Sequence, residues 1–211
     1  MVPILSILII SILTQSVFAY YNLEHSFSIT PPGGWIAEDQ EGIIVVLFTS
    51  PSLFTKASIN IAVEEIDGTF SQYIAASKEG IETMLNDYVL VTEGNRIIDG
   101  LDCYQIVSTY TIAAVEFKAS QYIFFENGKA YVITCACSLP EYDNLLLDFE
   151  DCVATFGLGD SLETSDTSDT GDTNSDTNVL MIGGIVAVLV LVVVVLLVIL
   201  FLKKKKLTDL F

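Results

Sequence analysis

Hydrophobic and polar positions at the start of the region 20–158 repeat with the period of β-strands. The alternating segment 25–30, HSFSIT, predicts a half-buried strand that ends at the prolines and glycines of PPGGW. The apolar run 42–48, GIIVVLF, predicts a strand buried on both faces, and the alternating run 57–63, ASINIAV, predicts a third strand. A sheet is therefore expected to begin here.

The period then changes to that of a helix. Apolar residues recur at helical spacing from residue 70 to residue 88. Thr69 followed by Gln72 forms a capping-box pattern at the start of this run. The pattern predicts an amphipathic helix of about five turns with one stripe on a core.

A second helical stripe occupies residues 142–156. Ser138 with Glu141 predicts a capping box before it, Pro140 fits the first turn, and Gly157 predicts its end.

The chain between the two helices has the pattern of four further strands, 88–98, 102–112, 115–125 and 129–137. The first is predicted to be interrupted by a turn at Gly94-Asn95, and Asn127-Gly128 predicts a hairpin between the last two. The order β-β-β-α-β-β-β-β-α indicates an α+β domain built on a mostly antiparallel sheet.

The first nineteen residues have a different pattern. Residues 4–12 are apolar, and Val17 and Ala19 occupy the −3 and −1 positions of a small-residue cleavage site. We expect residues 1–19 to be a secretory signal peptide; an uncleaved anchor is the alternative, but the apolar run is short for a membrane span.

The C-terminal part contains a long uncharged segment. Residues 179–202 include no charged side chain, and a helix of that length, roughly 36 Å, is long enough to cross a bilayer. The cluster of Lys203, Lys204, Lys205 and Lys206 that follows predicts a cytoplasmic stop, within a basic tail 203–211. A single-pass protein of the cell membrane is expected, with its N-terminal domain outside and its C-terminus cytoplasmic. The basic tail argues against a glycosyl-phosphatidylinositol signal.

Residues 159–178 are rich in Asp, Thr and Ser and predict an extended, solvated stalk. Calcium binding is an alternative, but the acidic residues recur with a period of about three, unlike the alternate ligands of an EF-hand loop. O-glycosylation of the threonines is a further alternative that rests on composition alone.

The remaining residues 20–158 are enough for one domain with a core of its own. The whole chain has a formal net charge of −18, and this domain contains 20 acidic and 5 basic residues. No basic patch lies outside the tail, which argues against nucleic-acid binding. Acidic clusters at residues 38–41, 64–67 and 148–151 predict solvated faces, with a cation site or a basic protein partner as the alternative.

Two short patterns in residues 20–158 have a characteristic order and spacing. The first, F-x-I-x-x-P-x-G-W, consists of Phe27, Ile29, Pro32, Gly34 and Trp35. The second, G-x-x-Y-V-I-T, consists of Gly128, Tyr131, Val132, Ile133 and Thr134. With these patterns the chain resembles the PsbP-like family, whose fold is shared with the lipoprotein DcrB and a yeast Ran-binding import factor, over nearly all of residues 20–158.

This resemblance implies an α/β/α sandwich and an accessory or binding role without catalysis. It does not imply photosystem function, because the chain is acidic, lacks a basic flexible N-terminal region and has a predicted anchor. No family metal ligand matches a residue of this sequence, so no catalytic residue, cofactor or metal ligand is predicted. Trp35, Phe27, Tyr104 and Tyr131 are expected in the core.

Catalytic signals are weak. His25 is the one histidine of the chain, it has no nearby Ser or Cys partner, and no Gly-x-Ser-x-Gly pattern is present. We therefore expect a protein that is not an enzyme, with a hydrolase whose site has no known pattern as the alternative.

Cys103, Cys135, Cys137 and Cys152 are an even set in a domain expected outside the cell. Cys135 and Cys137 are two residues apart on one strand, so they share a face and are poorly placed to bond each other. A disulfide from Cys152 to Cys135 or Cys137 is one prediction, and four buried thiols are the alternative.

The functional hypothesis is a membrane-anchored, extracytoplasmic domain that binds a protein partner or a small ligand. Its C-terminal helix would contact membrane lipid. A related alternative is an assembly factor for a membrane complex, in which an acidic face of the domain binds a basic subunit.

Overall fold

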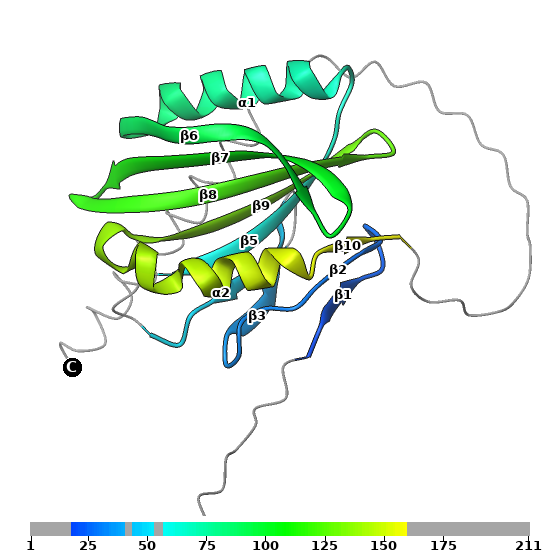
Figure 1. Cartoon of the computed structure of the whole chain (residues 1–211), viewed down its shortest axis with the longest axis horizontal. Helices are drawn as coiled ribbons and strands as arrows, with labels where there is room; N and C mark the ends of the chain where they lie inside the picture. Colours follow the sequence, from blue (N-terminus) through cyan, green and yellow to red (C-terminus); the bar gives the residue numbers. More distant parts are fainter. Residues whose placement is uncertain (1–17, 41–43, 53–56, 160–211) are drawn as a thin grey trace, which may run out of the picture.

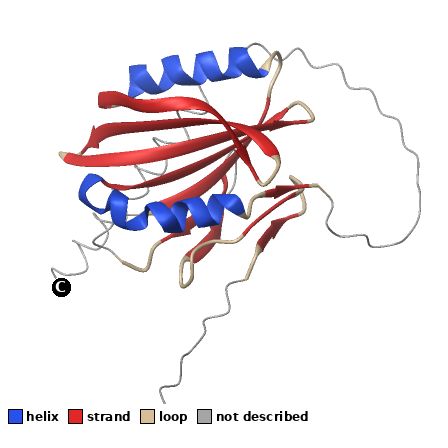
Figure 2. Ribbon diagram, in the orientation of Figure 1, coloured by secondary structure: helices blue, strands red, loops and turns tan. Residues whose placement is uncertain are grey.

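The computed structural model describes residues 18–40, 44–52 and 57–159, and these form an α+β fold dominated by antiparallel sheet (Figures 1 and 2). The larger sheet has seven strands in the order β3-β4-β5-β9-β8-β7-β6. Their bounds are β3 Ile36–Asp39, β4 Ile44–Thr49, β5 Ser58–Glu65, β6 Asn86–Ile98, β7 Leu101–Ile112, β8 Val115–Glu126 and β9 Lys129–Ser138. Every adjacent pair is antiparallel, as predicted.

A small second sheet joins the two ends of the domain. It has the order β1-β2-β10, with β1 Tyr20–Asn22, β2 Phe27–Ile29 and β10 Gly157–Leu158. Phe27 and Ile29 are buried, as the alternation predicted. The pairing of β10 with β2 brings the end of the domain beside its beginning (Figure 1).

The four long strands are connected by two-residue turns. Asn127-Gly128 has positive φ at both residues, which is the conformation of a type I′ hairpin and confirms the predicted β8–β9 turn. Asp99-Gly100 and Ala113-Ala114 have the same pattern of positive φ. Each turn pairs the residues on either side of it, so β6 to β9 form a continuous meander.

One helix lies on each face of the large sheet (Figure 1). Helix α1, Phe70–Met84, packs through Tyr73, Ile74 and Ile81 on one face. Helix α2, Tyr142–Ala154, packs through Phe149 and other residues on the opposite face, which the small sheet also covers. The result agrees with the α/β/α arrangement that the family resemblance implied.

The start of α1 was predicted correctly and its end was not. Thr69 and Gln72 form the capping box: the Gln72 backbone N–H donates to the Thr69 hydroxyl over 3.3 Å, and the Thr69 backbone N–H donates to Gln72 Oε1 over 2.9 Å. The helix ends at Met84, because Leu85 already has extended backbone angles and Asp87 has a positive φ. Tyr88 therefore belongs to β6.

The predictions for α2 hold in part. A 3₁₀ turn, Leu139–Glu141, precedes the helix with Ser138 at its N-cap position and Pro140 in its first turn, as predicted. The Ser138 side chain makes no capping hydrogen bond there, so the predicted capping box is absent. The helix ends at Ala154, and Gly157 begins β10. Phe156 is buried beyond the helix against Phe27 and Phe124.

Three further predictions for the strands need correction. Strand β6 runs without interruption through Gly94-Asn95, because both residues pair with β7. Strand β5 is buried on both faces from Ser58 to Val63 because α1 covers the face that alternation assigned to solvent. The short strands β1, β3 and β10 were missed.

Of the four aromatic residues predicted in the core, two are buried and two are partly buried. Phe27 and Tyr131 are buried, and their rings meet edge to face. Trp35 is partly buried against Phe149 of α2, with ring centroids 6.2 Å apart, and Tyr104 packs partly buried on the α1 side.

The predicted signal peptide, stalk, membrane helix and basic tail fall almost entirely on residues 1–17 and 160–211, outside the described residues, and stay predictions. Within the described part of the chain, neither helix is long and apolar enough to cross a bilayer.

Candidate functional site

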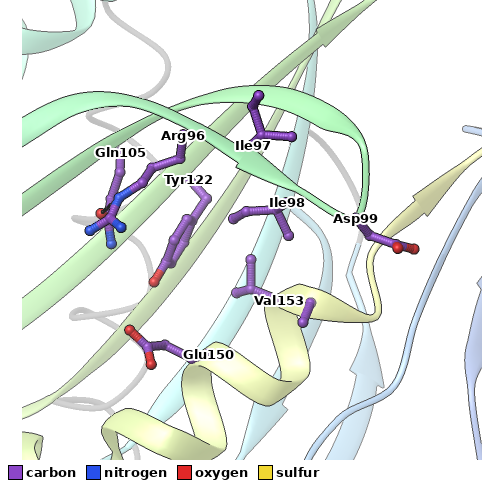
Figure 3. A pocket seen from close by; sticks show the side chains of 9 residues that line it. Arg96, Ile97, Ile98, Asp99, Gln105, Tyr122, Glu150 and Val153 are labelled. Atoms are coloured by element: carbon purple, nitrogen blue, oxygen red, sulfur yellow. Dashed lines mark hydrogen bonds between the residues drawn. The ribbon is translucent and has the colours of Figure 1, made fainter.

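A pocket of about 320 Å³ lies between α2 and the β6–β7 end of the large sheet (Figure 3). It opens on the face of the sheet that α2 covers. Its lining residues are Arg96, Ile97, Ile98, Asp99, Gln105, Tyr122, Glu150, Val153 and Ala154.

The sheet register explains how the strand residues meet. Gln105 of β7 lies opposite Tyr122 of β8, and Arg96 lies two residues along β6 from Gly94, the partner of Gln105. Side chains two residues apart on a strand point to the same face. Arg96, Gln105 and Tyr122 therefore converge toward α2.

The helix supplies the opposite wall. Glu150, Val153 and Ala154 lie three and four residues apart on α2, a spacing that places them on one side of the helix. Figure 3 shows Val153 facing Ile98, and Glu150 on the side where the Tyr122 hydroxyl lies. The pocket thus has a polar part near Tyr122 and an apolar part near Val153.

Arg96 is held in place by a neighbour. Its Nε–H donates to Gln105 Oε1 over 2.9 Å. Gln105 is itself buried, so its amide has few alternative orientations. The guanidinium lies beside Gln105 on the sheet side of the pocket (Figure 3).

Tyr122 forms the floor of the polar part. It is 3% exposed, and burial, with the nearby Cys135, Tyr142 and Glu150, raises the pKa of its hydroxyl. The hydroxyl therefore stays protonated at neutral pH and can donate a hydrogen bond. The floor offers a donor, whereas Glu150 on the wall offers only acceptors.

Arg96 and Glu150 carry opposite charges on different elements, and the structure records no ion pair between these two described side chains. A guanidinium and a carboxylate that do not pair with each other can each bind a complementary group of a ligand. No His, Ser, Thr or Cys lines the pocket, so it has no group of the kinds that commonly act as a nucleophile with a base.

His25, the histidine weighed as a catalyst, lies elsewhere. Its backbone carbonyl accepts a hydrogen bond from the Tyr131 hydroxyl over 3.0 Å, and its backbone N–H donates to Asn22. The residue anchors the loop between β1 and β2.

The four cysteines are buried and recorded as free thiols. Cys135 and Cys137 lie on the same face of β9, as predicted, and share one core cluster with Cys152 of α2. Burial raises the pKa of Cys152 and Cys137 to about 12 and that of Cys103 to about 11. These thiols are not ionised at neutral pH, and the disulfide from Cys152 stays a prediction.

The acidic clusters do not form a cation site in the described residues, where no three potential ligands converge. Glu38 and Asp39 are exposed on β3, and Asp148, Glu150 and Asp151 are exposed on α2. Tyr20 donates to Asp39 over 2.7 Å.

A second polar group, under α1, was missed from the sequence. Five side-chain oxygens there are buried and have no hydrogen-bond partner among the described residues; they belong to Asn60, Glu64, Tyr73 and Ser77. Burial raises the pKa of Glu64 to about 7, and the nearby Tyr73 hydroxyl opposes part of the shift.

The pocket itself was also missed, although Glu150 was named within an acidic cluster. Arg96 was the available signal, because it is one of few basic residues in residues 20–158. Its proximity to Glu150 depends on the packing of α2 on the sheet.

The sequence matches no protein-family model and no curated protein. Solved structures do match. The solution structure of cyanobacterial PsbP (CyanoP) from Synechocystis is 16% identical, with a TM-score of 0.55 over 71% of this chain and 96% of that chain. The chain has the PsbP-like fold.

Two other solved structures match at lower scores. A protein of unknown function from Pseudomonas aeruginosa is 14% identical over 72% of this chain and 99% of its own, with a TM-score of 0.45. The Ran-binding protein Mog1p of Saccharomyces cerevisiae is 10% identical over 69% and 96%, also with a TM-score of 0.45. At these identities the PsbP-like likeness describes the fold alone.

Proposed function

We propose that this protein is a single-pass, membrane-anchored PsbP-like domain outside the cytoplasm that binds a small ligand or a partner without transforming it. The pocket between α2 and the β6–β7 end of the sheet is its binding site. The function is argued from this site, because a fold shared at 16% identity hosts unrelated activities.

The anchor and orientation rest on the sequence. A cleavable signal at residues 1–19, a span at residues 179–202 and the lysines of 203–206 would together leave the domain outside and the tail inside, and the sequence patterns of these segments support this arrangement. The acidic residues 159–178 would hold the domain away from the bilayer surface.

The main observation in favour of binding is that Arg96 and Glu150 line the same pocket without forming an ion pair with each other. Tyr122 forms the floor of this pocket, and one side of it is apolar. Pockets that combine an apolar wall with a few convergent polar groups are the usual form of a ligand site. Gln105 orients Arg96 in advance, which lowers the ordering cost on binding.

Photo-crosslinking tests this proposal. A benzoylphenylalanine at Ala154, on the pocket rim, should capture the ligand or partner when the full-length chain is irradiated in its own membrane. Arg96→Gln in the same chain should reduce the yield at least tenfold. A probe at Asn144, exposed on the same helix but outside the pocket lining, is the matched control.

A second candidate function is an assembly factor that docks a basic subunit on α2. The helix contains no basic residue, and its outer side combines exposed Asp148 and Asp151 with Leu147, whose side chain is 70% exposed. An exposed leucine among carboxylates suits a partner with an apolar pocket and a basic rim. Capture of a protein from Asn144 that is lost in Leu147→Ser, with none from Ala154, would favour this function over the pocket.

The hydrolase alternative has little support in the pocket. Glu64 has a carboxyl group whose pKa is raised to about 7, but it lies under α1, on the face of the sheet opposite to the pocket. Convergent carboxylates of perturbed pKa in one cleft would be the signature of such an enzyme. We therefore propose binding without catalysis.

A further inference from the structure

We infer that the pocket takes a small zwitterion, a molecule with one carboxylate and one ammonium group on an apolar scaffold, of which an aliphatic amino acid is the simplest case. This inference rests on the proposed binding function and specifies the ligand class for the same pocket.

The carboxylate end is matched by donors. The Nε–H of Arg96 donates to Gln105, and the two Nη groups of the guanidinium can donate hydrogen bonds to an anion. The Tyr122 hydroxyl adds a neutral donor at the floor. Charge-assisted hydrogen bonds of a guanidinium to a carboxylate are among the stronger interactions available to a binding site.

The ammonium end is matched by Glu150. Its carboxylate stands on α2, opposite the strand that carries Arg96, and it accepts hydrogen bonds but cannot donate them. Lys118, whose ammonium lies 4.2 Å over the Tyr142 ring and 3.6 Å from Asp143, is engaged nearer the start of the helix. Glu150 is therefore not neutralised by that cation.

The apolar scaffold is matched by Ile98 and Val153, which face each other in Figure 3, and by Ala154, which also lines the pocket. The volume of about 320 Å³ lies at the lower end of the range for ligand pockets, which favours a compound smaller than a drug-sized molecule. An aliphatic side chain of a few carbons would cover this wall.

Ligands with a single charge fit less well. A ligand with only a negative charge would be attracted by Arg96 but repelled by Glu150. A ligand with only a positive charge would be attracted by Glu150 but repelled by Arg96. A neutral ligand would remove water from both charges without pairing either. A zwitterion satisfies both walls at once.

Calorimetric titration of the full-length chain in detergent tests the ligand class with three probes that share one carbon skeleton. L-leucine carries both charges, L-leucinamide only the ammonium, and 4-methylpentanoate only the carboxylate. We expect leucine to bind at least tenfold more tightly than either analogue, since each analogue loses one charge-assisted contact.

Two variants assign the charges. In Arg96→Gln, leucine and leucinamide should bind equally, and in Glu150→Gln, leucine and 4-methylpentanoate should bind equally. Lys78→Gln and Asp148→Asn remove one charge of each sign outside the pocket lining and should keep the wild-type preference. The comparison of the three probes on the unmodified chain tests the ligand class even if a variant does not fold.

The outcomes separate the two proposals. If one analogue binds the unmodified chain as tightly as leucine, the zwitterion inference is wrong and a binding pocket remains. If none of the three probes binds at millimolar concentration, the inference is also wrong. The proposed function fails separately, when the Ala154 probe captures nothing that depends on Arg96.

Discussion

Glu64 illustrates how one residue can carry a pH dependence that its sequence context hides. It follows a run of apolar residues in β5 and was assigned to a solvated acidic cluster. In the structure both carboxylate oxygens are buried under α1, and neither has a hydrogen-bond partner among the described residues. Its pKa of about 7, raised mainly by burial, makes the protonated form the stable one below neutrality.

This raised pKa predicts the pH dependence of stability. The stabilising effect of the neutral carboxyl is fully present below about pH 4.5 and is lost as pH rises through about 7, because the unfolded chain ionises first. The loss amounts to about 3 kcal/mol in the free energy of unfolding. Denaturant titrations of Glu64→Gln should lack this component.

Glu65→Gln is the matched control, because Glu65 is the adjacent exposed residue of the same strand. The stability difference between the unmodified chain and Glu64→Gln should vary with pH, and the difference for Glu65→Gln should not. Parallel pH curves for all three proteins would show that Glu64 is solvated in solution.

The cysteines give a second prediction at this scale. Cys152 and Cys135 share one core cluster, and Cys152 contributes to the raised pKa of the Cys135 thiol, so their oxidation to a disulfide would join α2 to β9. Closing a loop of this size contributes about 3 kcal/mol in the chain-entropy description. Peptide mapping without reductant should detect a disulfide of Cys152 in the unmodified chain. The disulfide should be absent in Cys152→Ser and still present in the control Cys103→Ser. Four thiols that react with an alkylating agent after denaturation would contradict the disulfide.

Among the elements, both helices could be predicted from their period, because each buries one stripe, and the long strands from alternating or continuously apolar runs. Asn127-Gly128 identified its hairpin because its conformation requires positive φ at both residues. The short strands β1 and β10 were missed, since three or two residues show no period and their pairing depends on chain ends that meet only in the fold. The burial of Asn60 depends in the same way on α1.

The β7–β8 turn supports a stability prediction. Ala113 and Ala114 have φ of 48° and 63°, a region that costs a residue with a Cβ about 1 kcal/mol or more. Replacing them by Asn and Gly, the residues of the β8–β9 turn, should raise the free energy of unfolding by about 1 kcal/mol. Thermal melts measure this gain.

The reverse exchange is the control for that turn. Asn127→Ala with Gly128→Ala should destabilise the β8–β9 hairpin by a similar amount, because both positions have positive φ. An unchanged or lower melting temperature of the Asn-Gly variant at residues 113 and 114 would contradict the assigned turn conformation.

On the scale of the whole molecule, the pocket shows what sequence patterns leave open. Its charged groups come from β6 and α2, more than fifty residues apart, and meet only because α2 packs on the face to which Arg96 points. Composition alone predicts that the domain is acidic. In such a domain Arg96 is one of few positive charges that can bind an anionic group. The PsbP-like fold places the two walls, but the residues on them are features of this chain.

The proposed arrangement in the membrane makes a direct prediction. Protease added to intact cells should cleave within residues 160–178, which are acidic and rich in Thr and Ser, and release the folded domain. The full-length chain should stay in the membrane fraction in alkaline carbonate, whereas a chain that ends at residue 178 should not. A domain protected from the protease in intact cells would contradict the predicted orientation.

Hydrogen exchange measured by mass spectrometry on the full-length chain is the decisive test of ligand binding at the pocket, because it compares both faces of the sheet at once. With the small-molecule fraction of the cells of origin added, exchange should slow at residues 96–99 and 150–154, stay unchanged at α1, and show no effect of the fraction in Arg96→Gln. Protection confined to α1, or protection at the pocket that persists without Arg96, would contradict this prediction.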